Sequence, residues 1–308
     1  MNGEPGWIED GACGPPSPAK LWDQDVAQRA LDDLFAATAA YRSSVAYLEL
    51  MRFIGRFRFY APFNAMLVYV QRPGARYVAP AYRWKREYGR TIKAGANPLV
   101  VLQPMGPVMF VFDVADTEGG RLPPEVEHPF EVRKGRVGRE WPQTLENAKR
   151  DGIEVLDTTM GSQGAGGIKT ASPKNTKLLT FPRSSKDGDV ETVPVRYEIV
   201  LNGKLSREAQ YVTLVHELAH LYCGHLGSPN PKWWPDRRGM ASVEVEYEAE
   251  SVAFLICSRL GIDNPSDEYL AGYTEHKREV PPISLECVVK TAGLIENMGR
   301  ERLKSRKP

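Results

Sequence analysis

The chain has 308 residues, enough to bury a full core and to form two domains of ordinary size, and its 42% hydrophobic and 26% charged residues are typical of a globular protein. No apolar run approaches the roughly 18 residues of a membrane-spanning helix, and the N-terminus lacks the basic and then apolar order of a secretory signal, so we expect a cytoplasmic protein with no membrane partner. The net charge of +1 would argue against a nucleic-acid partner if it were evenly spread, but residues 52–93 alone contain ten basic residues and one acidic residue.

The beginning of the chain divides into a tail and a first domain. Residues 1–18 are rich in glycine and proline with little to bury, which predicts a disordered tail. Apolar residues then recur at helical spacing from about Ala19 to Met51, which predicts a long helix. A second helix is expected near residues 62–71, followed by short strands at 99–102 and 108–113. We group residues 19–115 as an N-terminal domain.

Basic and aromatic residues are interleaved between residues 52 and 114. A sequence-tolerant single-strand binder needs cations for phosphates beside flat rings for bases. A half-buried strand, with its rings in the core and its cations in solvent, produces the same alternation. The residues that would contact a nucleic acid are Arg56, Arg58, Arg83, Trp84, Lys85, Arg86, Arg90 and Lys93.

A family resemblance favours the nucleic-acid interpretation of this region. Five short stretches resemble the N-terminal domain of the ArdC anti-restriction proteins: Asn64–Leu67, Gln71–Ala75, Trp84, Gly89–Ala96 and Val111–Asp113. In that family the domain binds single-stranded DNA. The resemblance therefore implies an ArdC-like α+β domain with single-stranded DNA as a partner of residues 52–114.

Residues 116–145 carry prolines and charges with no sustained period, so we expect them to be a linker. A helix near Thr144–Asp151 and a strand near Ile153–Thr158 then open a second domain, residues 146–308. The glycine-rich run 161–170 is not a phosphate-binding loop, because Gly167 stands where that motif requires lysine. We interpret the run as a flexible loop that could form a lip over an active site.

A strand at residues 196–201, with a turn at Asn202–Gly203, precedes the next helix. Ser206 is placed to cap this helix, and Gly224 stands where it should end. The helix carries the motif His-Glu-x-x-His at residues 216–220. A strand followed by this helix resembles the order in zincin metallopeptidases, in which the strand presents an edge to an extended substrate.

The motif itself predicts a metal centre. Because His216 and His220 are four residues apart, both imidazoles lie on one helix face and can bind one zinc ion. Three protein ligands leave a fourth position for water, and bound zinc lowers the pKa of that water to about 7. Glu217 would then take the proton and pass it to the leaving amine.

The third metal ligand has two candidates. His225 lies shortly after the motif, but the metzincin pattern places its glycine and its last histidine where Cys223 and Leu226 stand here. Glu246 and Glu250 instead share one face of an expected helix, and burying that charged face would be costly unless a cation met it. The carboxylates are therefore the better candidates.

The helix expected from Ser242 to Leu260 resembles the gluzincin pattern Glu-x-x-Ala-Asp or Glu-x-x-Ala-Asn. The resemblance implies that Glu246 is a zinc ligand and that Glu250 orients a ligand histidine. Because glutamate replaces aspartate or asparagine at the last position, these two roles are open to exchange. Tyr273 and His276 follow where gluzincins often place a catalytic group that stabilises the oxyanion.

Three further features have a structural interpretation. The four cysteines form no Cys-x-x-Cys pair, and we expect Cys223 to be a buried thiol packed against Cys257. The loop at residues 233–238, which carries two tryptophans, either lines a substrate cleft or covers the core. Residues 284–303 form a C-terminal helix whose apolar side packs against the rest of the chain.

Taken together, residues 195–262 resemble the ImmA/IrrE family of metallo-endopeptidases, some of which cleave repressors. The two resemblances imply an α+β chain in which an ArdC-like domain precedes a zincin-like domain, with the His-Glu-x-x-His helix after a small mixed sheet and Zn²⁺ as cofactor. The implied function is cleavage of a repressor-like regulatory protein by zinc-activated water, with Glu217 as general base. The alternative is an ArdC-like single-stranded DNA-binding anti-restriction or regulatory protein whose zinc site is structural or vestigial.

Overall fold

The computed structural model describes residues 41, 44–103, 106–122, 136–160, 165–172, 174, 176–182, 190–262, 266, 270, 279–304 and 306. The predicted tail and most of the helix predicted from Ala19 to Met51 lie outside these residues. The part of that helix that is described is helical and continues to Arg56.

The N-terminal part combines helices with small antiparallel sheets. Strand β4 pairs with β1 and β3, and β2 pairs with β5. The helix predicted near residues 62–71 and the strands predicted at 99–102 and 108–113 are confirmed. The elements are α2 (Ser44–Arg56), α3 (Pro62–Gln71), β1 (Val78–Ala79), α4 (Ala81–Tyr88), β2 (Arg90–Ile92), β3 (Leu99–Gln103), β4 (Gly106–Asp113), the short 3-10 helix η3 (Val114–Asp116) and β5 (Thr117–Gly119).

The C-terminal part is built on a mixed sheet of three strands in the order β6, β10 and β7, with β6 parallel and β7 antiparallel to β10. Helix α7 follows β10 directly, so the predicted α+β class and the small mixed sheet before the motif helix are confirmed. The elements are α6 (Glu140–Arg150), β6 (Ile153–Thr158), β7 (Gly166–Thr170), β8 (Leu178–Pro182), β9 (Val190–Pro194), β10 (Tyr197–Asn202), α7 (Arg207–Tyr222), α8 (Ser242–Leu260) and α10 (Leu285–Arg300). None of the helices among the described residues is long and apolar enough to cross a membrane.

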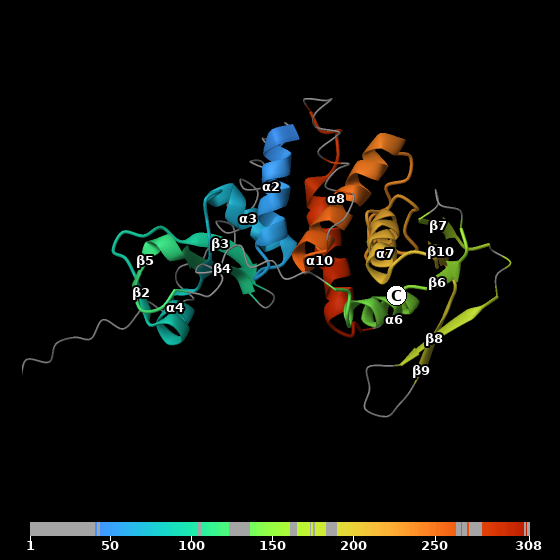
Figure 1. The fold of residues 1–308 in the computed structure, drawn as a ribbon, viewed down its shortest axis with the longest axis horizontal. Helices are drawn as coiled ribbons and strands as arrows, with labels where there is room; N and C mark the ends of the chain where they lie inside the picture. Colours follow the sequence, from blue (N-terminus) through green and yellow to red (C-terminus); the bar gives the residue numbers. More distant parts are fainter. Residues whose placement is uncertain are drawn as a thin grey trace, which may run out of the picture.

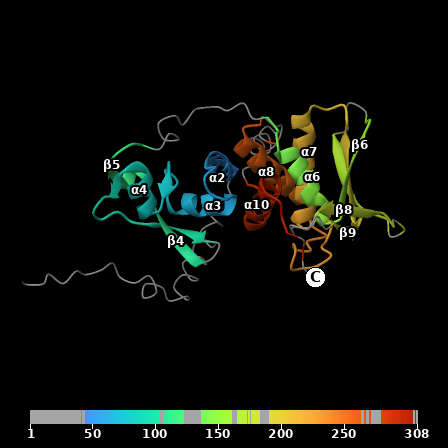
Figure 2. The same ribbon diagram turned by 90° about the horizontal axis from the view of Figure 1, so that it is seen from below.

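The core lies where helices from both ends of the chain meet (Figures 1 and 2). Helix α2 packs against α8, and α10 packs against α3, α6 and α8. Most apolar residues of α2 recur at helical spacing and are buried, whereas Val45 near its beginning is 69% exposed. The hydroxyl of Tyr47 on that helix donates to Ser251 Oγ of α8 at 2.8 Å. The predicted packing role of the C-terminal helix is confirmed, since its apolar face belongs to the same core.

Secondary structure extends into the segment predicted as a linker. Strand β5 forms at its beginning, and α6 begins at Glu140, four residues before the predicted helix. Pro142 lies in the first turn of α6, where a missing backbone N–H leaves no helical hydrogen bond unmade. The proline therefore marks the beginning of a helix and not an irregular connection.

Candidate metal centre

Helix α7 has the local signals that its sequence predicts. Ser206 caps it, with the side-chain oxygen accepting a hydrogen bond from the backbone N–H of Ala209 at 3.3 Å. The helix ends at Tyr222, and Gly224 then adopts a φ of +85°, where a Cβ would lie 2.2 Å from the carbonyl oxygen of Pro235. Only glycine fits this close approach, so the chain turns away immediately after the motif.

The two motif histidines meet on one face of α7. Nε2 of His216 and Nε2 of His220 lie 3.0 Å apart, and His220 is buried. Two ring nitrogens that both bind the same zinc ion at about 2.0–2.1 Å must themselves lie about 3–4 Å apart. The pair therefore has the separation that a shared divalent metal ion requires.

Helix α8 adds carboxylates on both sides of His216. Oε2 of Glu246 lies 3.5 Å from Nε2 of His216, and Oε1 of Glu246 lies 3.7 Å from Nε2 of His220. Oε1 of Glu250 lies 3.5 Å from the other ring nitrogen of His216, Nδ1. Glu246 thus faces the Nε2 atoms of both histidines, and Glu250 faces Nδ1 of His216. The donor set of two imidazoles and a carboxylate suits zinc and similar divalent ions.

Mutual contacts set the charge states of the two histidines. Burial lowers the pKa of His216, but its hydrogen bond to Glu246 and the charges of nearby glutamates outweigh burial and raise that pKa above its ordinary value. Burial and the neighbouring His216 lower the pKa of His220 to about 4. His220 is therefore neutral at physiological pH, as a metal ligand must be.

Glu217 lies beside these ligands and also contacts β7. It is 8% exposed, and its carboxylate accepts a hydrogen bond from the backbone N–H of Ile168 on β7. Burial raises the pKa of Glu217, with the positive charge of His216 opposing this and the negative charge of Glu246 adding to it. The carboxylate is held beside the histidines with a greater proton affinity than an exposed glutamate has.

Two predictions about the strands are wrong. The strand that precedes α7, β10, lies between β6 and β7 and has no open edge. The glycine-rich run, for which the sequence predicts a loop, forms β7 from Gly166 onwards, because it pairs with β10. Among the described strands β7 pairs with β10 alone, so the edge beside Glu217 belongs to the glycine-rich strand.

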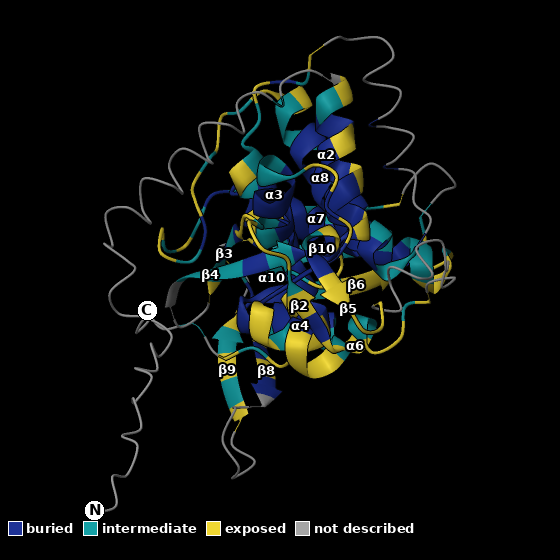
Figure 3. Cartoon of the chain, turned by 90° about the vertical axis from the view of Figure 1, so that its left-hand side faces the viewer, coloured by how far each residue is buried: buried dark blue, intermediate teal, exposed yellow. Residues whose placement is uncertain are grey.

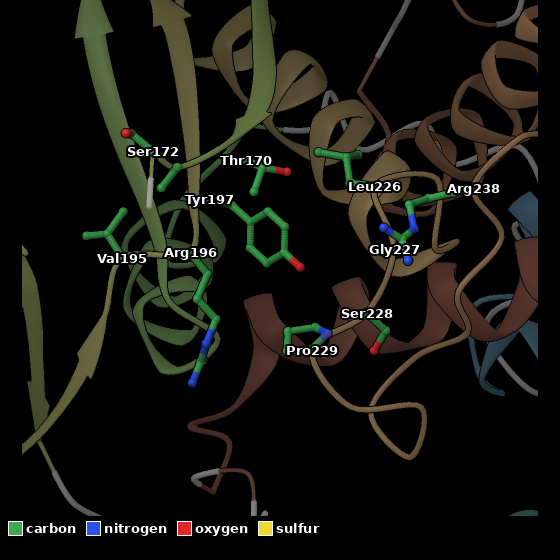
Figure 4. Close-up of a pocket in the computed structure, with 11 residues that line it drawn as sticks. Thr170, Ser172, Val195, Arg196, Tyr197, Leu226, Gly227, Ser228, Pro229 and Arg238 are labelled. Atoms are coloured by element: carbon green, nitrogen blue, oxygen red, sulfur yellow. The ribbon is translucent and has the colours of Figure 1, made fainter. Parts of the chain in front are cut away.

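A pocket of about 370 Å³ lies beyond the end of β7 (Figure 4). Tyr197 points into it from β10, and Leu226 and Ser228 border it from the segment after α7. Arg196 and Arg238 also line it. The pocket therefore continues the line of β7 away from Glu217 and is lined by both polar and apolar groups.

The remaining candidates from the sequence have other positions. His225 is not among the three converging ligands, because its Nδ1 lies behind His220, 3.1 Å from Nδ1 of that ring. The thiol that neighbours Cys223 is that of Cys287, and Cys223 also contacts Thr291 at 3.5 Å. Tyr273 and His276 lie outside the described residues.

The loop with two tryptophans covers the core. Trp234 is 4% exposed, donates from Nε1 to the carbonyl oxygen of Gly227 at 2.9 Å, and packs edge-on against Tyr222 with ring centroids 5.3 Å apart. The same loop brings in Arg237, which forms two hydrogen bonds of 2.6 and 2.7 Å with Glu248. No pattern in the sequence pointed to this buried ion pair.

Two of the residues expected to contact nucleic acid belong to the interior. Trp84 is fully buried and donates from Nε1 to the carbonyl oxygen of Phe112 at 2.9 Å, so neither face of its ring is available to a base. Arg90 is 9% exposed, and its guanidinium donates to Thr117, Gly119 and Gly120. Both residues hold the N-terminal part together.

The other basic candidates are at the surface, and α4 shows a broad exposed face (Figure 3). Lys85 and Arg86 are exposed, and the Arg86 guanidinium lies 5.8 Å from the ring centroid of Tyr82, which is 63% exposed. Arg83 and Arg86 both pair with Glu87, which offsets part of their charge. Three further cations contact other parts of the protein: Arg56 lies over the ring of Phe53, Arg58 donates to the carbonyl of Ser258, and Lys93 donates to the carbonyl of Ala115.

Comparison with known proteins agrees with the position of the metal centre. Residues 169–260 match the model of a peptidase family, M78, described as the IrrE N-terminal-like domain. This segment runs from β7 to the end of α8 and contains His216, Glu217, His220 and Glu246. The match supports the predicted resemblance to the ImmA/IrrE family for this segment.

Two solved structures of the antirestriction protein ArdC from plasmid R388 match most of the chain, with low identity and low TM-scores. The metal-free structure has 13% sequence identity and a TM-score of 0.37, covering 90% of this chain and 96% of that chain. The Mn(II)-bound structure has 14% identity and a TM-score of 0.38, covering 91% and 98%. The comparison with curated proteins gave no match.

Proposed function

We propose that this protein is a zinc-dependent endopeptidase in which His216, His220 and Glu246 hold the metal ion and Glu217 is the general base. The observation that carries the proposal is the convergence of two imidazole nitrogens and a carboxylate beside a buried glutamate that is bonded to a strand edge. The match of residues 169–260 to a peptidase family supports it. Zinc is preferred to other divalent ions because two imidazoles and one carboxylate are a common catalytic zinc set.

The burial of Glu217 and its hydrogen bond to β7 support its proposed role as general base. Zinc in such a site polarises the scissile carbonyl and lowers the pKa of bound water towards about 7. The Glu217 carboxylate accepts a proton from the attacking water and then donates it to the leaving amine nitrogen. Because burial raises the pKa of Glu217, the carboxylate holds that proton more readily than an exposed one, and the Ile168 N–H keeps it oriented.

The open edge of β7 is the proposed place for the substrate. Ala171 N donates to Arg196 O, and Asn202 N donates to Ala165 O, so odd-numbered residues of β7 face β10. The backbone groups of Gly166 and Thr170, like the Ile168 N–H, therefore point to the open side, where an extended segment of a repressor-like protein can pair. The pocket beyond Thr170 would take one of its side chains.

Replacement of the third ligand tests the metal centre. We expect Glu246→Ala to weaken zinc binding by more than the roughly 10- to 100-fold that loss of an outer hydrogen-bond partner costs. Zinc affinity is measured by competition with a chromogenic chelator, and hydrolysis is measured on unstructured protein substrates. Glu286→Ala is the control, since Glu286 is exposed and, among the residues that the structure describes, forms an ion pair with Lys290 alone on α10. Wild-type affinity in Glu246→Ala would remove Glu246 from the proposed site.

A pair of glycine substitutions tests the role of β7. A Cβ at Gly166 would lie 2.6 Å from the carbonyl oxygen of Val200 and 2.7 Å from Thr213 Cγ2, whereas a Cβ at Gly167 would meet no described atom within 4 Å. We expect Gly166→Ala to cost about 1–3 kcal/mol of stability and to lower hydrolysis by displacing the strand from α7. Gly167→Ala should behave like the wild type in urea unfolding and in peptidase assays. Equal effects of the two substitutions would contradict this account.

The second candidate function is single-stranded DNA binding, and the exposed pair of Tyr82 and Arg86 favours it. Phe59 is also 46% exposed, and Lys85 adds a further exposed cation on the same helix as Tyr82. Flat rings beside cations suit bases and phosphates. Trp84 and Arg90 are left out of this proposal, because both are buried.

We expect the triple substitution Tyr82→Ala, Lys85→Ala and Arg86→Ala to weaken binding of an oligothymidylate strand. Loss of two phosphate contacts should lower the slope of log affinity against log salt by about 1.4, and loss of one stacked base should cost about 1–3 kcal/mol. Fluorescence anisotropy at several salt concentrations measures both. The control is Lys204→Ala with Lys232→Ala, two exposed lysines of the C-terminal part. Binding that depends equally on both sets would indicate a non-specific charge effect.

A further inference from the structure

A buried carboxylate, Glu248, lies behind the candidate metal centre with all of its hydrogen-bonding capacity in use. Its Oε2 accepts from His225 Nε2 at 3.0 Å and from Arg237 Nη1 at 2.6 Å. Its Oε1 accepts from Arg237 Nη2 at 2.7 Å and from the backbone N–H of Ser284 at 2.8 Å. Glu248 is 0% exposed, so it is a fixed, ionised acceptor that faces a guanidinium on one side and an imidazole on the other.

Glu248 is not itself a metal ligand. It lies near the thiols of Cys223 and Cys287, and these three residues come close enough to hold an ion. The bidentate contact with Arg237, however, already places a positive charge on both carboxylate oxygens. A cation there would have to displace a buried ion pair, which is strongly unfavourable.

The contact with Glu248 determines which ring nitrogen of His225 carries a hydrogen. Because an ionised carboxylate only accepts, Nε2 of His225 must carry a hydrogen and donate it. In the neutral imidazole the other nitrogen, Nδ1, is then an acceptor. The side chain of His225 is 3% exposed, so water has little access to compete for that acceptor.

Nδ1 of His225, the acceptor nitrogen, in turn orients the ring of His220. The two Nδ1 atoms lie 3.1 Å apart, so Nδ1 of His220 carries the hydrogen between them. The lone pair of His220 is consequently on Nε2, the atom that lies 3.0 Å from Nε2 of His216. The chain of contacts thus points that lone pair into the candidate metal centre.

We propose that His225 and Glu248 are positioning residues of the metal centre, with Arg237 fixing Glu248, Glu248 fixing His225, and His225 fixing both the ring and the tautomer of His220. The inference rests on the proposed function, since it requires a metal ion at Nε2 of His220. It assigns a role to the histidine that follows the motif and to a glutamate between Glu246 and Glu250, neither of which faces the ion.

The test compares zinc affinity among variants of the full chain by competition with a chromogenic chelator. His225→Leu removes the acceptor, and Glu248→Gln offers an amide donor that reverses the tautomer of His225. Both should weaken zinc binding roughly 10- to 100-fold. His225→Asn keeps an acceptor oxygen near the position of Nδ1 and should retain most of the affinity. In the Co²⁺-loaded protein, His225→Leu and Glu248→Gln should change the visible absorption bands, and His225→Asn should restore them.

Glu296→Gln is the matched control, because Glu296 is also a buried glutamate paired with an arginine, Arg259, but it contacts no metal ligand. We expect this control to lower the thermal unfolding temperature and to leave zinc affinity and Co²⁺ absorption unchanged. Wild-type affinity in both His225→Leu and Glu248→Gln, or equal losses in His225→Leu and His225→Asn, would overturn the positioning role alone. Absence of zinc binding by the wild-type protein would overturn the metal centre and this inference together.

Discussion

Replacement of Glu217 by glutamine is expected to reduce peptide hydrolysis by about 10²- to 10⁴-fold while the protein retains its zinc. Glutamine has the shape of glutamate but cannot accept a proton from water, so the general base is lost. Its amide oxygen can still accept the hydrogen bond that Ile168 N–H donates to Glu217, so the edge of β7 should stay in place. Single-turnover cleavage of an unstructured protein, followed by mass spectrometry, measures the loss.

The zinc content of this variant separates the chemical explanation from a structural one. We expect one zinc ion per chain in both the wild type and Glu217→Gln, because His216, His220 and Glu246 are unchanged. Glu286→Gln, an exposed glutamate of α10, serves as the control and should cleave at the wild-type rate. Full activity in Glu217→Gln would exclude Glu217 as the base, and loss of zinc would show that the substitution disturbs the site itself.

The centre of the site was predictable because its geometry is local. Four residues of α-helix place His216 above His220 whatever the rest of the fold does, and the distance of 3.0 Å between their Nε2 atoms agrees with that expectation. The approach of Glu246 depends on the packing of α8 against α7. The family resemblance predicts this long-range contact, whereas the spacing of apolar residues alone does not.

The strand beside Glu217 was not predictable from its own residues. Glycine has a low preference for strands, so Gly166–Thr170 has the composition of a loop. The segment becomes a strand because β10 offers a partner along its length. Gly166 also allows the backbone to approach Thr213 of α7 closely, which any side chain would prevent.

The interleaved rings and cations of the N-terminal part could not be sorted from sequence, because a core and a base-binding surface use the same aromatic residues. Trp84 and Tyr82 are two positions apart on α4, yet Trp84 is fully buried and Tyr82 is 63% exposed. On a helix, positions two apart point to different sides. Only the position of α4 against its neighbours decides which ring remains available.

Replacement of Arg259 by methionine is expected to destabilise the whole chain by about 3–5 kcal/mol, since it leaves a buried partner charge unpaired. Arg259 lies near the end of α8, and its guanidinium donates to Glu296 of α10 at 2.8 Å. It also donates to the carbonyl oxygens of Ile54 and Phe57, each at 3.0 Å, and to that of Tyr60 at 2.7 Å. The buried side chain of Arg259 therefore provides hydrogen-bond donors for the carbonyl oxygens at and after the end of α2, and it joins the two parts of the molecule.

The position of Arg259 also determines how the protein should unfold. Because α2 packs against α8, and Arg259 bonds the backbone that follows α2, we expect the N-terminal and C-terminal parts to unfold in a single transition in the wild type. Chemical denaturation followed by both tryptophan fluorescence and circular dichroism would give coincident curves. In Arg259→Met the midpoint should fall, and the two curves should separate if the contact holds the parts together.

Arg300→Met is the matched control, since Arg300 also donates to Glu296, at 2.7 Å, but its side chain is 45% exposed. Solvent screens this pair, so its loss should cost at most about 1 kcal/mol. The double variant Arg259→Met with Glu296→Leu should recover part of the stability lost in Arg259→Met, because it removes the unpaired carboxylate but leaves the carbonyl oxygens near the end of α2 without their donor. A cost for Arg259→Met no larger than that for Arg300→Met would mean that the buried guanidinium does not join the two parts, and that the apolar contacts between α2 and α8 suffice.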